Sequence, residues 1–442
     1  MKKRLIEKFN QPNSLVVISG YPKKKQTYSQ GVCAVSSFTK NTLSKLQHEN
    51  SFQKIIVLAP TIHAREIYEE DGILVVRCFK RNSPLSYVGL LKAILRFGRV
   101  TNILIEFEFA SFGNTFMTSL LIPIVWLLFL LGKNLVLVIH QVVSDIQSLS
   151  GHIGVEKRSL KMQFLGFSLG LFYALLTIPA KKIVVLEEEF KHKLSRFVNK
   201  DKIIVIPHGI DTNIKIVDRQ SARKKLGIKN DEFAVLYFGY LTWYKGIDFL
   251  IQALKNETSL NGKKIRLVIA GGPSFTQGEK YHYKRFLRQL DVLMANATNI
   301  TYTGFVKEEA LTSVFTACDL AVLPYRTFMS SSGPLSLAIS HAKPFILSEN
   351  LEALFNSADF KKALQLNNLD KNQLIFKLAK KNLLETIKIS MDPEINQKMV
   401  SLSKTLKEER SFIRIAKIYN DVLFRNKIGE INAIYSLAPA NN

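Results

Sequence analysis

Short apolar runs alternate with amphipathic segments along the first half of the chain. Seven of these runs have the length and the β-branched content of buried strands. They are Leu15–Ser19, Lys54–Ala59, Gly72–Arg77, Asn102–Phe109, Asn134–His140, Lys182–Leu186 and Ile203–Ile206. Because helical patterns separate most of them, the first half is predicted to form a parallel, doubly wound sheet.

The same pattern begins again after the segment Pro207–Asp211. Five more strands are predicted, at Phe233–Phe238, Ile265–Ala270, Ile300–Thr303, Leu320–Leu323 and Pro344–Leu347. We therefore expect one α/β domain over residues 1–207, a second over 208–405, and a closing helix with a polar tail over 406–442. Open α/β sheets bind ligands beyond the carboxyl ends of their strands, so two such sheets facing each other would place a site in the cleft between them.

Two apolar stretches raise the question of a membrane. Residues Phe109–Gly132 contain no charged side chain and are long enough to span a bilayer. A crossing would put the strands before and after it on opposite sides, so a buried or interfacial helix is favoured. The second stretch, Lys157–Leu176, has a basic start and an aromatic continuation. That pattern fits a helix in a membrane interface and a core helix equally well.

Composition adds one strong feature, a net charge of +25 over 442 residues. Such a charge attracts polyanions. No zinc-finger spacing, RNA-recognition signature or arginine-rich tail is present, so an anionic membrane surface is favoured over nucleic acid. The three cysteines lie far apart and have neither metal-ligand spacing nor an even count for disulfides. Together with a start that does not read as a signal peptide, this predicts a cytoplasmic protein.

The clearest chemistry lies between Phe238 and Ser348. A strand runs into Gly239, a short loop reaches Lys245-Gly246, and an apolar helix follows. Glycine lets the backbone approach a ligand, while a helix start with a lysine favours a phosphate. Further on, Ser330–Gly333 opens another helix with hydroxyl and N–H donors. An ordinary strand–loop–helix unit with a surface lysine is the alternative for the first motif.

Six motifs in this stretch follow one another in a fixed order. They are Gly239–Gly246, Ala270–Pro273, Asn299–Gly304, Cys318–Tyr325, Ser331–Ala338 and Lys343–Ser348. The order resembles the C-terminal half of family 4 (group 1) glycosyltransferases, which have the GT-B fold. In the same way, Ile206–Asp211 resembles the segment between the two Rossmann-like domains of that family. Arg410–Tyr419 resembles its closing helix, which packs back on the first domain.

The resemblance implies retaining transfer from a nucleotide-sugar substrate, with no metal and no cofactor. No Asp-x-Asp pair occurs in the chain, so the usual acidic bridge to a metal diphosphate is missing. The family's loop lysine, which holds the donor diphosphate, is Lys245 here. Many members have an arginine after the first glycine, where this chain has Tyr240, and Arg326 is a candidate substitute. The expected donor-binding set is Gly31, Gly239, Tyr240, Lys245, Gly272, Gly304, Tyr325, Arg326, Ser331, Ser332 and Gly333.

The chain departs from the family at two acidic positions. Many members have two glutamates eight residues apart, but Met329 and Leu337 stand at those places, and no such pair occurs in the sequence. Either Ser330–Gly333 replaces them or activity is lost. The first domain is then expected to supply the catalytic groups.

Three first-domain residues at or just after predicted strand ends are the candidates. Relatives have a histidine near the transferred sugar where this chain has His140. Glu108 begins a segment that resembles a glutamate–glycine segment of some members, and Asp145 follows in the loop after His140. A satisfied structural group at a strand end is the alternative for each of the three.

The sequence thus predicts a hexosyltransferase that acts on a saccharide or lipid-linked acceptor, in cell-envelope polysaccharide or glycolipid synthesis. The lysine-rich loop Gly20–Gln30 is expected to receive an anionic acceptor. The enzyme would lie at the inner face of the cytoplasmic membrane. A GT-B nucleotide-sugar epimerase and a non-catalytic sugar-binding subunit are the rival interpretations.

Overall fold

Two separate β-sheets organise the computed structural model, which describes residues 2–28, 32–33, 35–49, 51–143, 160–274, 277–328 and 330–424. The first sheet has eight strands in the order β3-β4-β2-β1-β5-β6-β7-β8. Their bounds are β1 Leu15–Ile18, β2 Ile55–Pro60, β3 Glu66–Glu70, β4 Ile73–Phe79, β5 Asn102–Phe107, β6 Asn134–Ile139, β7 Lys182–Val185 and β8 Ile203–Val205. All neighbours pair in parallel except β3 with β4. The predicted doubly wound sheet is confirmed.

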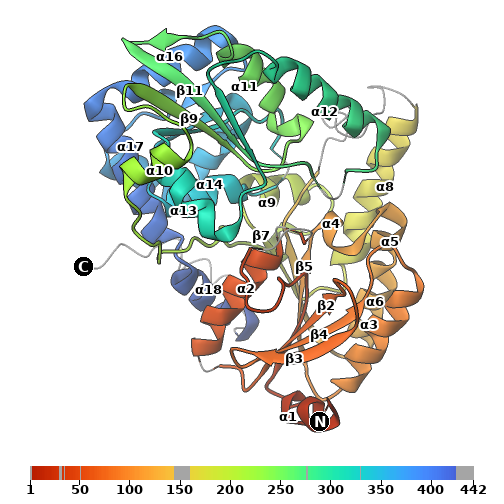
Figure 1. Cartoon of the computed structure of the whole chain (residues 1–442). Helices are drawn as coiled ribbons and strands as arrows, with labels where there is room; N and C mark the ends of the chain where they lie inside the picture. The colour runs from red at the N-terminus through yellow and green to blue at the C-terminus, as the bar shows by residue number, and fades with distance from the viewer. Residues whose placement is uncertain are drawn as a thin grey trace.

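The helices of the first half flank this sheet (Figure 1). They are α1 Lys2–Phe9, α2 Val35–Leu46, α3 Leu85–Arg96, α4 Phe109–Phe112, α5 Thr115–Ser119, α6 Leu121–Leu130, α8 Leu160–Thr177 and α9 Glu188–Leu194. The strands between them are built from Val, Ile and Leu with nearly every side chain buried. Such strands are covered on both faces, as a parallel sheet requires.

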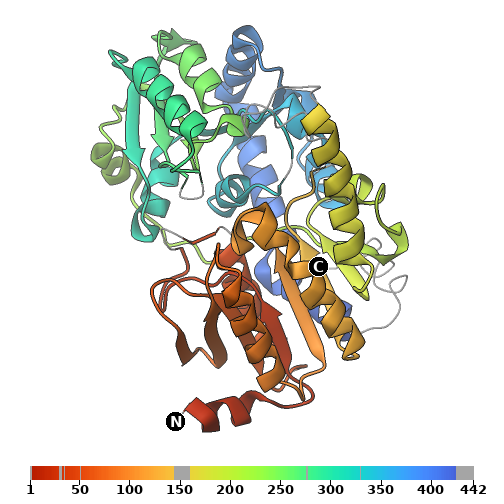
Figure 2. The ribbon, with the colours of Figure 1, turned by 90° about the vertical axis from the view of Figure 1, so that its right-hand side faces the viewer.

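The second sheet has seven strands, ordered β10-β11-β9-β13-β14-β15 with β12 also paired to β11. Their bounds are β9 Glu232–Phe238, β10 Ser259–Leu260, β11 Lys263–Ala270, β12 Ile300–Gly304, β13 Leu320–Leu323, β14 Phe345–Ser348 and β15 Ile375–Phe376. The helices are α10 Arg219–Lys225, α11 Ile247–Leu254, α12 Tyr281–Met294, α13 Glu308–Ala317, α14 Gly333–Ser340, α15 Ala358–Leu366, α16 Lys380–Met391, α17 Pro393–Glu409 and α18 Phe412–Phe424. The two halves form the two lobes seen in Figures 1 and 2.

The last helix belongs to the second half in sequence but to the first in space. α18 lies beside α2 at the first sheet (Figure 1). Its apolar side chains Phe412, Ile415 and Tyr419 share a buried cluster with Leu15 and Val17 of β1. The expected closing helix that crosses back to the first domain is therefore confirmed.

The uncharged stretch Phe109–Gly132 forms three short helices between two strands of one sheet. β5 and β6 on either side of it pair in parallel, with Asn102 opposite Asn134. Among the described residues, no helix combines the length and apolarity that a membrane crossing requires. Gly113, with φ of 126°, and the Asn114 cap separate α4 from α5. Pro123 falls in the first turn of α6, where no N–H is needed, so it does not break that helix.

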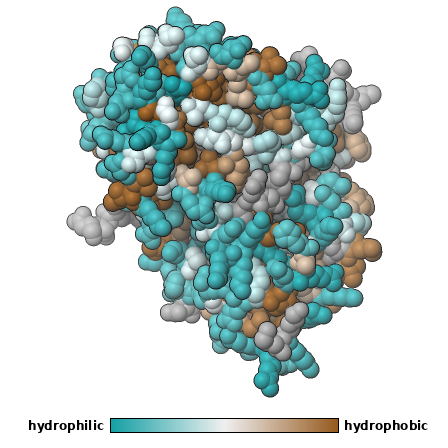
Figure 3. Space-filling model, in the orientation of Figure 1, coloured by the Kyte–Doolittle hydropathy of each residue, from teal (hydrophilic) through white to brown (hydrophobic). Residues whose placement is uncertain are grey.

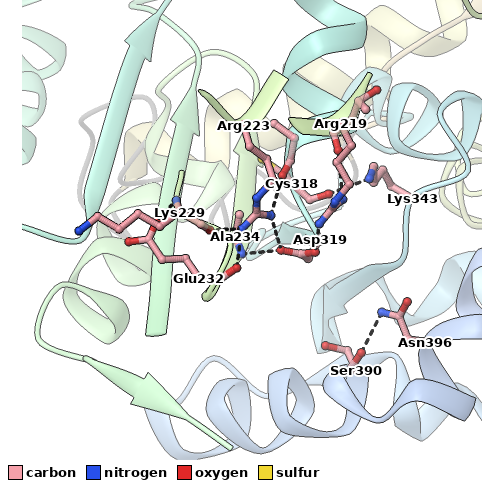
Figure 4. A network of polar contacts seen from close by, with 12 residues as sticks. Arg219, Arg223, Lys229, Glu232, Ala234, Cys318, Asp319, Lys343, Ser390 and Asn396 are labelled. Atoms are coloured by element: carbon pink, nitrogen blue, oxygen red, sulfur yellow. Dashed lines mark hydrogen bonds and ion pairs between the residues drawn. The ribbon is translucent and has the colours of Figure 1, made fainter. Parts of the chain in front are cut away.

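A network of ion pairs fixes the amino-terminal edge of the second sheet (Figure 4). Asp319, just before β13, accepts from Arg223 Nη1 at 3.2 Å and from the backbone N–H of Ala234 in β9 at 2.7 Å. Arg266 of β11 pairs with Glu232 at 2.6 Å. Because these contacts lie at the strand starts, they are structural and leave the carboxyl ends available for a ligand.

Candidate donor and catalytic site at the domain interface

Loops from the carboxyl ends of both sheets meet at one interface. The backbone of Gln141, after β6, forms a bridge with Ser330, which precedes α14. Ser331 Oγ donates to Glu187 Oε1, after β7, at 2.9 Å. The two sheets therefore present their ligand-binding edges to each other, as the sequence predicted.

Lys245 lies at the centre of the second half's contribution. β9 leads through Gly239 into a 3₁₀ turn, Trp243–Lys245, and then through Gly246 into α11. Gly246 has a φ of 69°, and a Cβ there would lie 1.9 Å from the carbonyl oxygen of Pro324. Only glycine fits that position, so the turn that holds Lys245 depends on it.

The ammonium of Lys245 is buried without a carboxylate. Its side chain is 8% exposed, and Nζ faces the rings of Tyr244 and Tyr325, each centroid 5.9 Å away. Within the described part of the chain, neither an ion pair nor a hydrogen bond engages Nζ. Burial lowers the pKa of Lys245 to about 8. A cation that faces only π systems is poised to bind an incoming anion.

The predicted glycines gather around this turn. A Cβ on Gly239 would lie 2.8 Å from Lys245 Nζ, so the lysine passes directly beside that backbone. The carbonyl of Gly272 accepts a hydrogen bond from Leu241 N at 3.0 Å. Gly304, at the end of β12, pairs with Ala270 at the end of β11. Of the five expected glycines, these three lie at adjoining strand ends and Gly333 begins α14, whereas Gly31 falls outside the described residues.

The hydroxyl donors at the start of α14 all have protein partners here. Ser332 caps the helix by accepting from Leu335 N at 3.2 Å and shares a 3.0 Å hydrogen bond with the Tyr325 hydroxyl. Ser331 is bonded to Glu187. Gly333 is the first residue of α14. A donor phosphate at this helix start would therefore have to compete with, or add to, these internal bonds.

Arg326 braces the loop that carries Lys245. Its guanidinium makes two bonds to Asp248 at 2.7 and 2.8 Å and one to Trp243 O at 2.6 Å. The central guanidinium carbon, Cζ, also lies 4.9 Å from the centroid of the Trp243 ring. Asp248 already pairs with this guanidinium, and the expected role of Arg326 as a second cation for the diphosphate stays a prediction.

Glu108 and His140 of the first half are brought together, as expected for one site. Burial raises the pKa of the Glu108 carboxyl, and the neighbouring His140 counters that effect. Burial raises the pKa values of Tyr240 and Tyr244 to about 12, and the charge of Glu108 adds to both shifts. This coupling places Glu108 beside the loop that ends at Lys245. Asp145 lies outside the described residues.

His140 is itself held by a second glutamate. Its Nε2 lies 2.6 Å from Oε2 of Glu106, and both side chains are buried. The Phe38 ring packs edge-on against the imidazole at 4.9 Å. Glu106 is not among the catalytic residues predicted from the sequence. Glu187 and Glu308 were missed altogether, although Glu187 directly follows an apolar strand just as Glu108 does.

Comparison with known families supports this geometry. Residues 218–345 match the family model described as glycosyl transferases group 1. The second lobe is a group 1 glycosyltransferase domain. The match runs from the residue before α10 to the first residue of β14 and includes Lys245 and the serine-rich start of α14.

Curated relatives align with this chain over part of their length. A D-inositol 3-phosphate glycosyltransferase of Stackebrandtia nassauensis is 30% identical over 128 residues, 28% of either chain. A GDP-mannose:glycolipid 4-beta-D-mannosyltransferase of Xanthomonas campestris is 31% identical over 114 residues, 25% of this chain and 29% of that one. An uncharacterized glycosyltransferase of Methanocaldococcus jannaschii is 26% identical over 155 residues, 34% and 37% of the two chains. The alignments thus span about a third of the relatives' length.

Solved structures extend the fold match to nearly the whole chain. Sucrose-phosphate synthase from Thermosynechococcus elongatus superimposes with a TM-score of 0.68 at 15% identity, covering 93% of this chain and 98% of that one. WaaG, a glycosyltransferase involved in lipopolysaccharide biosynthesis, superimposes with a TM-score of 0.63 at 12% identity, covering 93% of this chain and 100% of that one. At these identities the likeness shows the fold, which is GT-B with two Rossmann-like domains, as the motif order predicted.

Proposed function

We propose that this protein is a retaining, metal-independent glycosyltransferase that moves a hexose from a nucleotide-sugar to a saccharide or lipid-linked acceptor. The observation that carries the proposal is the buried ammonium of Lys245, which lacks a carboxylate partner among the described residues and lies at a glycine-lined helix start. A nucleoside diphosphate supplies two negative charges of the kind that such a site binds. The group 1 domain that contains Lys245 supports the same ligand class.

In the proposed reaction, the acceptor hydroxyl attacks the sugar C1 on the face from which the diphosphate departs. The C1–O bond to phosphate breaks, the new C1–O bond to the acceptor forms, and the leaving diphosphate oxygen takes the hydroxyl proton. Lys245 stabilises the charge that develops on the diphosphate. Glu108 and His140, at the facing strand ends, position the sugar and the acceptor. No covalent protein intermediate is required, so the missing glutamate pair is compatible with activity.

A panel of UDP-, GDP- and ADP-sugars tests the proposal, since a ligand that binds the folded state raises the melting temperature. We expect one donor to stabilise the protein, and Lys245→Ala to lose that stabilisation. Lys343→Ala is the matched control, because desolvation also lowers the pKa of Lys343 to about 8 but this half-buried lysine donates to Cys318 O away from the interface. Product analysis by NMR then gives the anomeric configuration. Inversion, or epimerisation of the donor without an acceptor, would overturn the proposal, and binding without turnover would favour the non-catalytic subunit.

A lipid-linked acceptor fits an apolar surface on the first lobe. α6 and α8 contact each other, and they expose Phe129, Leu130, Phe164 and Phe167, the last at 72%. α5 adds Phe116 next to α6. Apolar atoms are visible at the corresponding right-hand edge of Figure 3. Exposed aromatic residues on a chain with net charge +25 suit an anionic bilayer, which would place the enzyme at the inner face of the cytoplasmic membrane.

Vesicle sedimentation tests this surface. We expect binding to phosphatidylglycerol vesicles and weaker binding to phosphatidylcholine. Phe164→Ser with Phe167→Ser should reduce sedimentation with the anionic vesicles. Tyr281→Ser with Val292→Ser, two exposed positions on α12 of the other lobe, is the control. Equal sedimentation of both double variants would contradict a docking role for α8.

A further inference from the structure

Glu106 and His140 form a buried ionisable pair at the carboxyl ends of β5 and β6. Glu106 is the fifth residue of β5 and is fully buried, and His140 follows β6 with 6% exposure. β5 and β6 are neighbours in register, with Glu106 opposite Val138. The two side chains therefore come from adjoining strands of a rigid sheet, and their 2.6 Å contact is set by the sheet itself.

Burying Glu106 at this position lowers the stability of the fold. Its second oxygen, Oε1, is buried and has no hydrogen-bond partner among the described residues. The hydroxyl of Tyr419, which α18 brings near, is buried and unpartnered as well. A buried carboxylate with one unmet oxygen lowers stability relative to an apolar residue of the same shape. An apolar or amide side chain would serve the core better, so the carboxylate has a use other than packing.

The hydrogen bonds of the His140 imidazole indicate what this carboxylate does. Because Oε2 of an ionised Glu106 can only accept, Nε2 must carry the proton. The other ring nitrogen, Nδ1, has no hydrogen bond to any described residue. With Nε2 fixed, Nδ1 is the one ring nitrogen left for a bound sugar or acceptor. Phe38 against the ring edge restricts rotation of the imidazole.

We propose that Glu106 is the positioning residue of the site: it fixes the tautomer and orientation of His140, which then presents Nδ1 to the transferred sugar. The kinetic part of this inference rests on the proposed glycosyl transfer, while the tautomer part does not. Glu106 and Glu108 thus have separate tasks although only one residue lies between them. Glu106 contacts His140 and acts through it, and Glu108 interacts electrostatically with Tyr244, the residue before Lys245.

The tautomer is measured directly on the full-length chain labelled with ¹⁵N-histidine. The His140 signals are assigned from their loss in His140→Asn. In the wild type we expect a protonated Nε2 and an unprotonated Nδ1, and in Glu106→Gln a mixture of both tautomers. Glu69→Gln, which removes a glutamate whose partner is Lys8 at the surface, should leave the signals unchanged. A wild-type His140 that is protonated on Nδ1 alone, or a Glu106→Gln tautomer identical to the wild type, overturns the proposal.

A double-mutant cycle then tests whether Glu106 acts through His140. Loss of a hydrogen bond to a charged group should lower kcat about 10- to 150-fold in Glu106→Gln, with little change in the donor KM. Combining Glu106→Gln with His140→Asn should be no worse than His140→Asn alone. Additive losses would mean an independent structural role and would overturn the proposal. If the wild type turns over no donor, the proposed function fails, and the NMR result still decides the role of Glu106.

Discussion

Glu308 Oε2 accepts a hydrogen bond from the backbone N–H of Tyr28 at 3.0 Å, across the interface between the two lobes. The same oxygen accepts from Thr27 N, also at 3.0 Å. The first lobe holds the other end of this loop, where Arg77 donates to Pro22 O at 2.5 Å and Glu70 accepts from Lys25 N at 2.7 Å. The lysine-rich loop predicted to receive the acceptor is therefore anchored by both lobes.

We predict that Glu308→Ala frees the interface end of this loop. Two bonds to one carboxylate are lost, so the amides of Thr27 and Tyr28 should exchange hydrogen about tenfold faster or more. In Glu308→Gln the exchange rates should lie between those of the wild type and Glu308→Ala, because the amide oxygen can still accept hydrogen bonds. Glu309→Ala is the control, since Glu309 is its exposed neighbour in the first turn of α13. Hydrogen-exchange mass spectrometry is the measurement, and equal rates in all three variants would show that the contact is not formed in solution.

Replacing Lys245 with methionine should strengthen the fold while it abolishes nucleotide binding. The folded chain gives up this proton at about pH 8, against 10.5 for an ordinary lysine. Between these two values the unfolded chain holds more protons, so this residue's contribution makes stability rise with pH. Below pH 8 the cost of burying the charge is present in full. Lys245→Met should therefore be more stable than wild type at pH 7, and the difference should shrink as the pH rises toward 10.

Urea denaturation at several pH values measures this difference, and titration with nucleoside diphosphates measures binding. Lys343→Met is the control for binding, which it should leave unchanged. A Lys245→Met variant that is less stable at pH 7, or that retains the affinity for nucleotide, contradicts the assignment of Lys245 as a ligand-binding cation held at a cost to stability.

Arg326 and Asp248 should act as one unit on donor affinity. If the guanidinium only braces the Lys245 turn, Arg326→Ala and Asp248→Ala should weaken donor binding to the same extent. The double variant should then be no worse than either single one. Calorimetric titration of the three variants decides the question. A larger loss of donor affinity in Arg326→Ala than in Asp248→Ala would support the direct contact between Arg326 and the phosphate that the sequence predicts.

Removal of Arg410 should be severely destabilising. This buried guanidinium lies 3.4 Å from Glu187 of the first lobe and is also bonded to Asp359 of the second. Arg410→Ala leaves the buried Glu187 and the largely buried Asp359 without their cation, at a cost of about 3–5 kcal/mol in the free energy of unfolding. Arg414→Ala, which removes a partly exposed pair with Glu409, should cost at most about 1 kcal/mol. Denaturant unfolding measures the free energy of unfolding of both variants. Similar losses in the two variants would contradict a buried, stabilising role for Arg410.

Apolar runs sufficed to predict twelve strands because parallel strands are buried on both faces. β3 was missed because Glu66–Glu70 is a polar edge strand, which no longer shows that pattern. The dipeptide Asp71-Gly72 between β3 and β4, both with positive φ, was the available signal for a tight hairpin. β10 and β15 have two residues each, too short for any periodicity.

The site was predicted where a local motif determines the chemistry and missed where a partner comes from far along the chain. Lys245 could be found because a strand, a glycine turn and a helix start are contiguous. The pairing of Arg326 with Asp248 could not be predicted because 78 residues separate them. Glu308 meets the loop at Tyr28 over a separation of 280 residues, so no local pattern could reveal that contact.

The return of α18 to the first lobe has a consequence for how the protein is made. The buried cluster that contains Leu15 and Val17 is completed by residues 412–424, which are synthesised about 200 residues after the last strand of the first sheet. At typical synthesis rates of roughly 5–20 residues per second, the nascent first lobe exposes that apolar face for on the order of tens of seconds. During this interval it is a natural client for a chaperone. An expression fragment that stops before Phe412 would keep the same face uncovered and should aggregate.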